Sequence, residues 1–221
     1  MLSTAMNDTS LRITEIFHSI QGESTWAGLP CVFVRLTGCP LRCVWCDTAY
    51  AFHEGERRDE DDVMAELGRL PTRLVCLTGG EPLAQPAAFP FVTRLLRAGW
   101  EVVVETSGHS STQALDPGAV VILDVKTPGS GELGRMDWAS VERLRPTDEA
   151  KFVIDGRGDY EWSRDVLRER RLPERTTVLF SPVHGVLDPG ALGRWILEDG
   201  LPVRLQVQLH KLLWPSVTRG A

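Results

Sequence analysis

The chain lacks any long apolar run. None of its 221 residues belongs to a stretch that approaches the roughly 20 apolar residues a helix needs to cross a bilayer, so a membrane is not an expected partner. The opening MLSTAMNDTS has neither the basic n-region nor the apolar h-region of a secretory signal peptide. We therefore expect a cytoplasmic protein, in which clustered cysteines bind metal more often than they form disulfides.

An excess of basic side chains is missing as well. The chain carries 24 Lys and Arg against 30 Asp and Glu, a net charge of -6, whereas nucleic-acid-binding domains usually present a basic patch. A nucleic acid is therefore not an expected partner. The length suits a single domain over residues 1–221 with a substantial core. Within it, residues 1–10 are predicted to be a disordered lead-in and residues 212–221 a C-terminal tail.

A fourth cysteine is absent beside a cluster of three. Cys39, Cys43 and Cys46 have the spacing C-x3-C-x2-C, whereas a closed iron–sulfur cluster uses four thiolates and a structural zinc site four ligands. Three close thiolates favour a cubane cluster with one iron left open for a cofactor or substrate. A zinc site would need a histidine, and His53 is the nearby candidate.

Strand-like and helix-like segments alternate along the chain. Apolar runs predict strands at residues 12–20, 30–38, 74–80, 101–108, 119–129, 150–154 and 176–185, and residues 201–213 are expected to close the chain as a strand and tail. Helical patterns cover residues 59–70, 86–100, 159–172 and 188–200. The two remaining cysteines, Cys31 and Cys76, fall in predicted strands and are expected in the core. The glycine-rich residues 128–136 are expected to form a mobile loop.

This alternation indicates a parallel sheet covered by helices. About six strand–helix units fit the length, while a full eight-unit barrel needs about 250 residues. We predict an α/β fold, a partial (β/α)6-type barrel with an N-terminal strand extension, and keep a doubly wound sheet as the alternative. In both architectures the chemistry lies at the C-terminal ends of the strands.

One such strand end carries two glycines. Gly79 and Gly80 allow the backbone to approach a ligand without a Cβ in the way, and Glu81 and Pro82 begin the next helix. Alone, this GGEP turn is weak evidence because glycine turns after strands are common. Here the turn follows the three-cysteine loop by one strand–helix unit, and the two motifs together are strong evidence for a cofactor site.

The cysteine loop followed by the GGEP turn resembles the radical S-adenosylmethionine superfamily. The resemblance implies a [4Fe–4S] cluster on the three cysteines and S-adenosylmethionine on the open iron, whose reductive cleavage releases a 5′-deoxyadenosyl radical; the cofactors carry the hard chemistry. The opening ITEIFHSIQGE and the later runs VETSG, LDVKTPGSGE, FSPVHG and LQVQLHKLLW resemble the 7-carboxy-7-deazaguanine synthase family over most of the chain. That likeness implies conversion of 6-carboxy-5,6,7,8-tetrahydropterin to 7-carboxy-7-deazaguanine with loss of ammonia, in queuosine and 7-deazapurine biosynthesis.

The resemblance also implies roles for individual residues. The family's Mg2+ ligand corresponds to Thr48, whose hydroxyl suits a hard cation. Taken alone, this hydroxyl could instead cap a turn. Substrate contacts fall on Ile20, Gln21, Gly22, Arg35 and Thr78. Contacts to S-adenosylmethionine fall on Trp45, Asp47, Gly80, Glu81, Ser107, Asp124, Val125, Lys126, Ser181, Pro182, Val183, His184 and Gln208.

Some of these assignments have structural alternatives. Arg35 suits a substrate carboxylate but could face solvent, and Asp124 with Lys126 could form a salt bridge at a strand end. Glu23 and Glu105 rank below the others, because buried carboxylates more often cap helices or pair with arginine. Some family members end soon after the HK-x-L run, and their terminal carboxylate reaches the substrate. In this chain the longer tail folds back, or a side chain substitutes, or that contact is absent, and the sequence leaves these options open.

Partners follow from the same likeness: a pterin substrate, a flavodoxin-like reductant and a second copy in a homodimer. One alternative is a glycyl-radical activating enzyme, which would share the cysteine loop, the GGEP turn and a motif such as Asp124–Lys126. It should lack the FHSIQGE opening. The other alternative is a non-catalytic iron–sulfur or zinc scaffold, which would need a fourth protein ligand.

Overall fold

The computed structural model describes residues 10–220 and contains a single nine-stranded sheet. The strands are β1 (Leu11–Ile20), β2 (Pro30–Leu36), β3 (Glu56–Arg58), β4 (Leu74–Gly79), β5 (Glu101–Thr106), β6 (Val120–Val125), β7 (Glu149–Ile154), β8 (Thr177–Pro182) and β9 (Arg204–Leu205). The helices are α1 (Glu60–Leu67), α2 (Ala88–Arg97), α3 (Trp138–Glu142), α4 (Arg157–Glu169), α5 (Pro189–Glu198) and α6 (Leu209–Leu213). Short 3-10 helices are η1 (Ala49–Phe52), η2 (Pro82–Ala84), η3 (Pro128–Ser130), η4 (Leu133–Arg135) and η5 (Leu172–Glu174).

The order of the strands is that of an open barrel. The sheet runs β3-β1-β2-β4-β5-β6-β7-β8-β9, and all pairs from β2 to β9 are parallel. Strand β1 pairs antiparallel with both β2 and β3 and extends the sheet at its N-terminal side. A doubly wound sheet would reverse its strand order at a switch point, whereas this order advances in one direction from β2 to β9. The predicted partial barrel with an N-terminal extension is confirmed.

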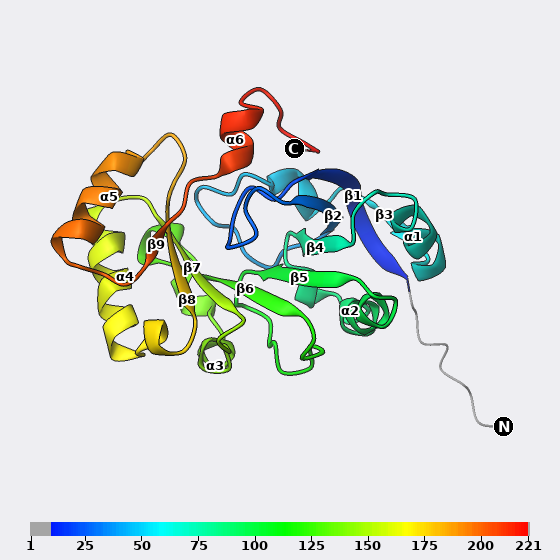
Figure 1. The fold of residues 1–221 in the computed structure, drawn as a ribbon, viewed down its shortest axis with the longest axis horizontal. Helices are drawn as coiled ribbons and strands as arrows, with labels where there is room; N and C mark the ends of the chain where they lie inside the picture. The colour runs from blue at the N-terminus through cyan, green and yellow to red at the C-terminus, as the bar shows by residue number, and fades with distance from the viewer. Residues whose placement is uncertain (1–9, 221) are drawn as a thin grey trace.

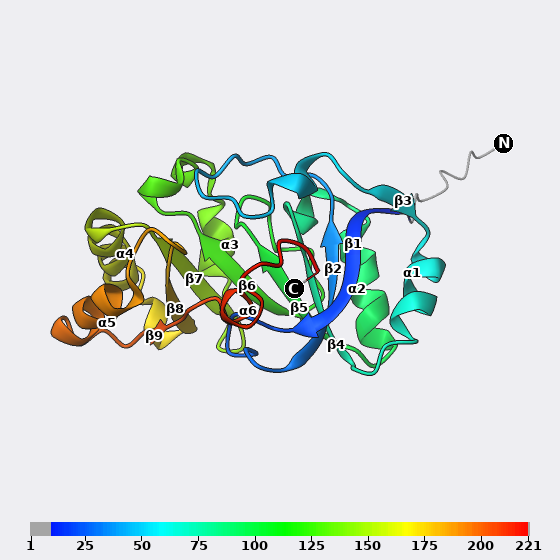
Figure 2. The ribbon, with the colours of Figure 1, turned by 90° about the horizontal axis from the view of Figure 1, so that it is seen from above.

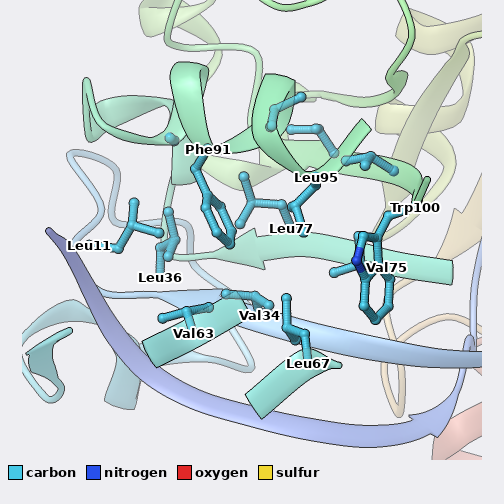
Figure 3. Packing of buried hydrophobic residues seen from close by; sticks show 14 of the residues in the cluster. Leu11, Val34, Leu36, Val63, Leu67, Val75, Leu77, Phe91, Leu95 and Trp100 are labelled. Atoms are coloured by element: carbon cyan, nitrogen blue, oxygen red, sulfur yellow. The ribbon is translucent and has the colours of Figure 1, made fainter. Parts of the chain in front are cut away.

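Helices α1 to α5 pack on the outer face of the curved sheet, and α6 lies on its inner side (Figures 1 and 2). One apolar core fills the layer between α1, α2 and the first strands, where Phe91 and Leu95 of α2 meet Leu77 of β4 (Figure 3). These two α2 residues are four apart and so share one helix face. A second core joins β6, β7 and β8 to α3, α4 and α5.

The inner face of the sheet changes from apolar to polar along each strand. Its apolar part is a buried cluster that includes Cys31, Phe33, Cys76, Val103 and Ile122. Side chains two residues apart on a strand share a face, so the next inward positions are Arg35, Thr78, Glu105 and Asp124, with Lys151 opposite Asp124 in the register of β7. We call these five residues the polar ring.

The core burial predicted for Cys31 and Cys76 is confirmed, since both are fully buried. Burial raises the pKa of the Cys31 thiol to about 12 and that of Cys76 well above its ordinary value. Thiols held in their protonated form are unreactive. These two cysteines therefore belong to the structure of the barrel interior.

Two predictions about elements are wrong in part. The segment 201–213, predicted as a strand, pairs with β8 only at Arg204–Leu205 and then forms α6. The segment 128–136, expected to be a mobile loop, contains η3 and η4 and packs on the cysteine loop: the Ser130 carbonyl accepts a hydrogen bond from the Val44 amide at 3.1 Å.

Two further points concern the ends of the chain and the membrane. Most of the lead-in expected at the N-terminus lies in residues 1–9, outside the described residues, as does Ala221. Among residues 10–220, none of the helices is both long and apolar enough to span a bilayer.

Candidate active site

A cavity of about 430 Å3 opens at the C-terminal ends of the parallel strands, directly above the polar ring. Small-molecule sites usually occupy about 300–1,000 Å3. Every residue assigned to the site from the sequence lines this cavity except Glu81 and Val125. Segments at the ends of β1, β2, β4, β5, β6, β7 and β8, which are far apart in the sequence, therefore meet at one place.

The cysteine loop forms one wall. Cys39, Cys43 and Cys46 are free, half-buried thiols that line the cavity, and the Leu41 amide donates to the Cys39 sulfur at 3.4 Å. Burial raises the pKa of Cys39 and of Cys43, so iron binding would have to displace their protons.

The thiol set fits a cluster. Across residues 10–220, no three Cys, His, Asp or Glu side chains are placed to hold one metal ion together. A mononuclear zinc site draws its ligands onto a single ion at about 2.0–2.3 Å, and the described residues offer no such site. A cubane cluster is held by thiolates on separate irons, and three thiols on one cavity wall match that requirement.

The GGEP turn packs directly against the cysteine loop. A Cβ on Gly80 would lie 2.2 Å from the Gly38 carbonyl oxygen and 2.8 Å from the Cys39 Cβ, and one on Gly79 would lie 2.2 Å from the Leu36 carbonyl oxygen. Gly79 also has a φ of +148°, which L side chains rarely adopt. The two glycines thus allow the turn to support the loop that carries the first cysteine.

Glu81 does not reach the cavity. Its carboxylate is fully buried and accepts hydrogen bonds from the Thr106 hydroxyl at 2.9 and 3.0 Å, from the Ser107 amide at 2.7 Å and from the Leu83 amide at 2.9 Å. The Ser107 hydroxyl, which lines the cavity, donates to the same carboxylate. Glu81 therefore joins the GGEP turn to the end of β5.

Val125 lies on the other face of its strand. Its side chain is buried in the core beneath α3 to α5, because its neighbours Asp124 and Lys126 take the inward positions. Those two form an ion pair of 2.8 Å in the cavity wall, so the salt bridge considered as an alternative exists, but inside the cavity. Burial alone would lower the pKa of Lys126, yet Asp124 outweighs it and the pKa is raised.

Arg35 is held in place by residues that the sequence did not single out. Its Nε donates to Glu15 Oε1 at 2.6 Å, and the Tyr50 hydroxyl donates to the same oxygen at 2.8 Å. The guanidinium lies 5.6 Å from the Phe17 ring centroid and 5.9 Å from that of Tyr50. The side chain is 12% exposed, so the solvent-facing alternative is wrong.

Four charged residues of the cavity wall were underrated or missed: Glu23, Glu105, Lys151 and Lys211. Glu105 accepts hydrogen bonds from Gln21 at 3.2 Å and from Thr78 at 3.0 Å. Glu23 pairs with Lys151 and accepts from Gln208 at 2.7 Å. Lys151 had a detectable pattern, because a lysine inside the apolar strand AKFVI must either face solvent or enter the barrel.

Thr48 stands at the N-terminus of η1, but its side chain makes no capping hydrogen bond. Its hydroxyl lines the cavity and lies 3.8 Å from the Cys46 sulfur. The turn-capping alternative is therefore not realised, and the hydroxyl remains a possible oxygen ligand.

The tail folds back over the site (Figure 2). The Leu209 amide donates to the Gly22 carbonyl at 2.9 Å, and Lys211 pairs with Asp47 at 2.9 Å. Farther along, Arg219 forms two hydrogen bonds with Glu54, at 2.8 and 3.0 Å, and lies 4.2 Å from the centroid of the Tyr50 ring. Of the options left open from the sequence, folding back is the one observed.

Comparison with known proteins agrees with this geometry. The profile of the Radical SAM superfamily matches residues 33–128. The 7-carboxy-7-deazaguanine synthase of Koribacter versatilis is 44% identical over 95% of this chain and 100% of its own length. The enzyme of the same name from Chlorobaculum tepidum is 38% identical over 96% of this chain and 98% of its own.

Solved structures show the same fold. QueE from Escherichia coli covers 93% of this chain and 100% of its own with a TM-score of 0.77 at 23% identity. SuiB from Streptococcus suis, solved with its precursor peptide SuiA, covers 77% of this chain and 46% of its own with a TM-score of 0.59 at 10% identity. On the strength of its near full-length relatives, the chain belongs to the 7-carboxy-7-deazaguanine synthase family of the radical S-adenosylmethionine superfamily.

Proposed function

We propose that this chain converts 6-carboxy-5,6,7,8-tetrahydropterin to 7-carboxy-7-deazaguanine with loss of ammonia. One observation carries the proposal: a single cavity brings the cysteine loop and the Gly79–Gly80 turn together with Gln21, Arg35 and Thr78. The relatives that bear the name of this activity align over almost the whole chain. In this chain the FHSIQGE opening supplies part of the cavity wall, which favours the pterin enzyme over a glycyl-radical activating enzyme.

Different residues of the cavity wall would bind the cofactors and the substrate. Cys39, Cys43 and Cys46 would hold the [4Fe–4S] cluster, which with S-adenosylmethionine supplies the radical that abstracts hydrogen from the substrate. Arg35, fixed by Glu15, would bind the substrate carboxylate, for which a guanidinium is the fitting partner. Glu105 would accept hydrogen bonds from the N–H edge of the pterin, because its two oxygens already accept from Gln21 and Thr78 and each has room for a further donor.

Mg2+ is part of the proposal, with the Thr48 hydroxyl as its protein ligand. Mg2+ prefers six oxygen ligands and usually keeps several waters, so one hydroxyl together with the substrate carboxylate and water would suffice. The uncapped hydroxyl in the cavity wall supports this assignment. The remaining contacts to S-adenosylmethionine, including Ser181–His184 and Gln208, stay predictions.

Other features of the proposal rest on the resemblance. The flavodoxin-like reductant, the homodimer and the cytoplasmic location stay predictions. The continuous nine-stranded sheet supports the prediction of one domain.

An anaerobic assay tests the proposed reaction. The protein is reconstituted with iron and sulfide and given dithionite, S-adenosylmethionine, Mg2+ and the carboxy-tetrahydropterin. We expect a deazaguanine product and ammonia. Release of 5′-deoxyadenosine without a deazaguanine would contradict the pterin substrate but keep the radical chemistry. A bound cluster that does not cleave S-adenosylmethionine would instead favour a non-catalytic iron–sulfur scaffold.

A further inference from the structure

Lysine is scarce in this chain, and its positions are not random. Of the 24 basic side chains only Lys126, Lys151 and Lys211 are lysines, and every other one is arginine. All three lysines line the cavity. Each pairs with a carboxylate of the same wall: Lys126 with Asp124, Lys151 with Glu23 and Lys211 with Asp47.

Arginine and lysine differ in their ability to transfer a proton. A guanidinium stays protonated in proteins, whereas an ammonium can lose its proton when its surroundings change. On the surface either cation serves, and this chain uses arginine there. Lysine confined to the cavity therefore points to positions where a compact ammonium, or its proton, is required.

Lys151 belongs to the most enclosed of the three ion pairs, since the carboxylate partners of Lys126 and Lys211 are 23% and 48% exposed. Its side chain is 14% exposed and that of its partner Glu23 is 12% exposed. The ammonium donates to one oxygen of Glu23, and the other oxygen accepts from the Gln208 amide. Asp124, which faces Lys151 across the β6–β7 register, is already paired with Lys126. The Lys151–Glu23 ion pair is thus separate from the Lys126–Asp124 ion pair and lies at the level of the polar ring.

The proposed reaction needs two linked proton transfers. Substrate and product differ only by ammonia, so no net electrons enter or leave. After ring contraction the expelled nitrogen departs as its C–N bond breaks, and it keeps that electron pair and needs a proton. The neighbouring ring carbon loses a proton, and the electrons of its C–H bond form the new double bond. One proton is therefore taken and one is given.

We propose that Glu23 is the base and Lys151 the acid of the ammonia-loss step, an inference that rests on the proposed function. Glu23 takes the proton from carbon, and Lys151 gives one to the leaving nitrogen. The proton on Glu23 then passes to the neutral Lys151 amine, which restores the ion pair. The cycle consumes no other reactant.

The pairing explains why the two steps are coupled. Burial disfavours the charged forms of both groups, and their mutual attraction is the largest influence that opposes it. With help from Gln208 at Glu23 and from Asp124 and Glu105 at Lys151, this attraction keeps the pKa of Glu23 lowered and that of Lys151 raised. When Glu23 gains a proton, Lys151 loses its paired counter-ion while it stays buried, although Asp124 and Glu105 still act on it. Its pKa then falls, so the ammonium becomes a better acid at the moment the leaving nitrogen needs a proton.

Single-turnover reactions of Lys151→Arg and Glu23→Gln test the proposal. Lys151→Arg keeps the positive charge but cannot donate its proton. We expect ammonia release to slow by about 10²- to 10⁴-fold in both variants, while substrate binding, measured by calorimetry, is retained. Because ring contraction is an isomerisation, mass spectrometry should detect a stalled species with the mass of the substrate but a different retention time.

Arg164→Lys is the matched control. Arg164 pairs with Asp199 at 3.1 Å on the outer helices, away from the cavity. The variant exchanges arginine for lysine in an ion pair, the reverse of Lys151→Arg, and should leave turnover unchanged. Ammonia release at the wild-type rate in both variants would overturn the proposal. So would a loss of substrate binding, or substrate that is bound but never consumed. If wild-type protein leaves the pterin unchanged, the proposed function itself fails.

Discussion

At the scale of single residues, burial separates the cysteines into two kinds. Cys43 lines the cavity, whereas Cys31 lies in the apolar floor of the barrel. Cys43→Ala should abolish the brown absorbance of the reconstituted cluster, because one of its three protein ligands is lost. Cys31→Ala should retain it. Retention of full absorbance in Cys43→Ala would show that the ligand set is wrong.

Glu81 gives a second prediction at this scale. Glu81→Ala would leave the buried donors of Thr106, Ser107 and Leu83 without their acceptor, and we expect the free energy of unfolding to fall by about 3 kcal/mol in urea titrations. Glu81→Gln keeps one acceptor oxygen and should lose less.

Calorimetry of S-adenosylmethionine binding separates this structural role from the ligand role predicted from the sequence. Glu81→Gln should bind the cofactor nearly as well as wild type. A large loss of cofactor affinity with unchanged stability would mean that Glu81 contacts the cofactor after all.

The sequence identified most residues of the cavity wall because they belong to short motifs at strand ends. It missed Lys151, whose neighbours are ordinary strand residues, and it underrated Glu23, whose partner lies 128 positions away. A lysine inside an apolar strand is a local signal, but its pairing with a carboxylate in a distant loop leaves no local pattern. The fixation of Arg35 by Glu15 and Tyr50 was unpredictable for the same reason.

At the scale of elements, α6 depends on a close contact with the loop after β1. A Cβ on Gly22 would lie 2.3 Å from His210 Nδ1, so the His210 ring packs directly on the glycine. Burial lowers the pKa of His210, although Glu23 and Asp47 oppose it. A lowered pKa stabilises the docked state above the pKa of the free side chain, near 6.5, and that stabilisation is lost as the pH falls.

We therefore expect α6 to dock less firmly as the pH falls below about 6.5. Hydrogen exchange of residues 206–213, corrected for the intrinsic effect of pH, should rise over this range. His210→Asn should remove the pH dependence. An equal rise in the variant would contradict the role of His210.

The same segment shows why some elements escape prediction. The alternating residues of LPVRLQVQLHKLL suggest a strand, yet the chain leaves β8 after Leu205. Gln206 is buried and donates to the Ser24 carbonyl at 3.1 Å, and the following residues cross to the Gly22 loop. Tertiary contacts on the cavity rim thus override the local period. The central strands were predictable because their apolar runs are buried on both faces.

At the scale of the whole molecule, one sheet joins two apolar cores. Phe91 lies in the first core and Phe180 in the second, and both are fully buried. Phe91→Ala and Phe180→Ala should each lower the free energy of unfolding by about 3–5 kcal/mol while a single transition is kept. Leu197→Ala, at a position that is 81% exposed, should change little. Two transitions, each moved by only one variant, would contradict the single domain.

The placement of the lysines has a practical consequence. Reagents that acylate or reductively alkylate amines usually modify the exterior of a protein at many points. Here they have no side-chain target outside the cavity wall, since Lys126, Lys151 and Lys211 all line it. Apart from the α-amino group, amine labelling of this chain becomes active-site labelling, and protection by a bound small molecule would report directly on occupancy.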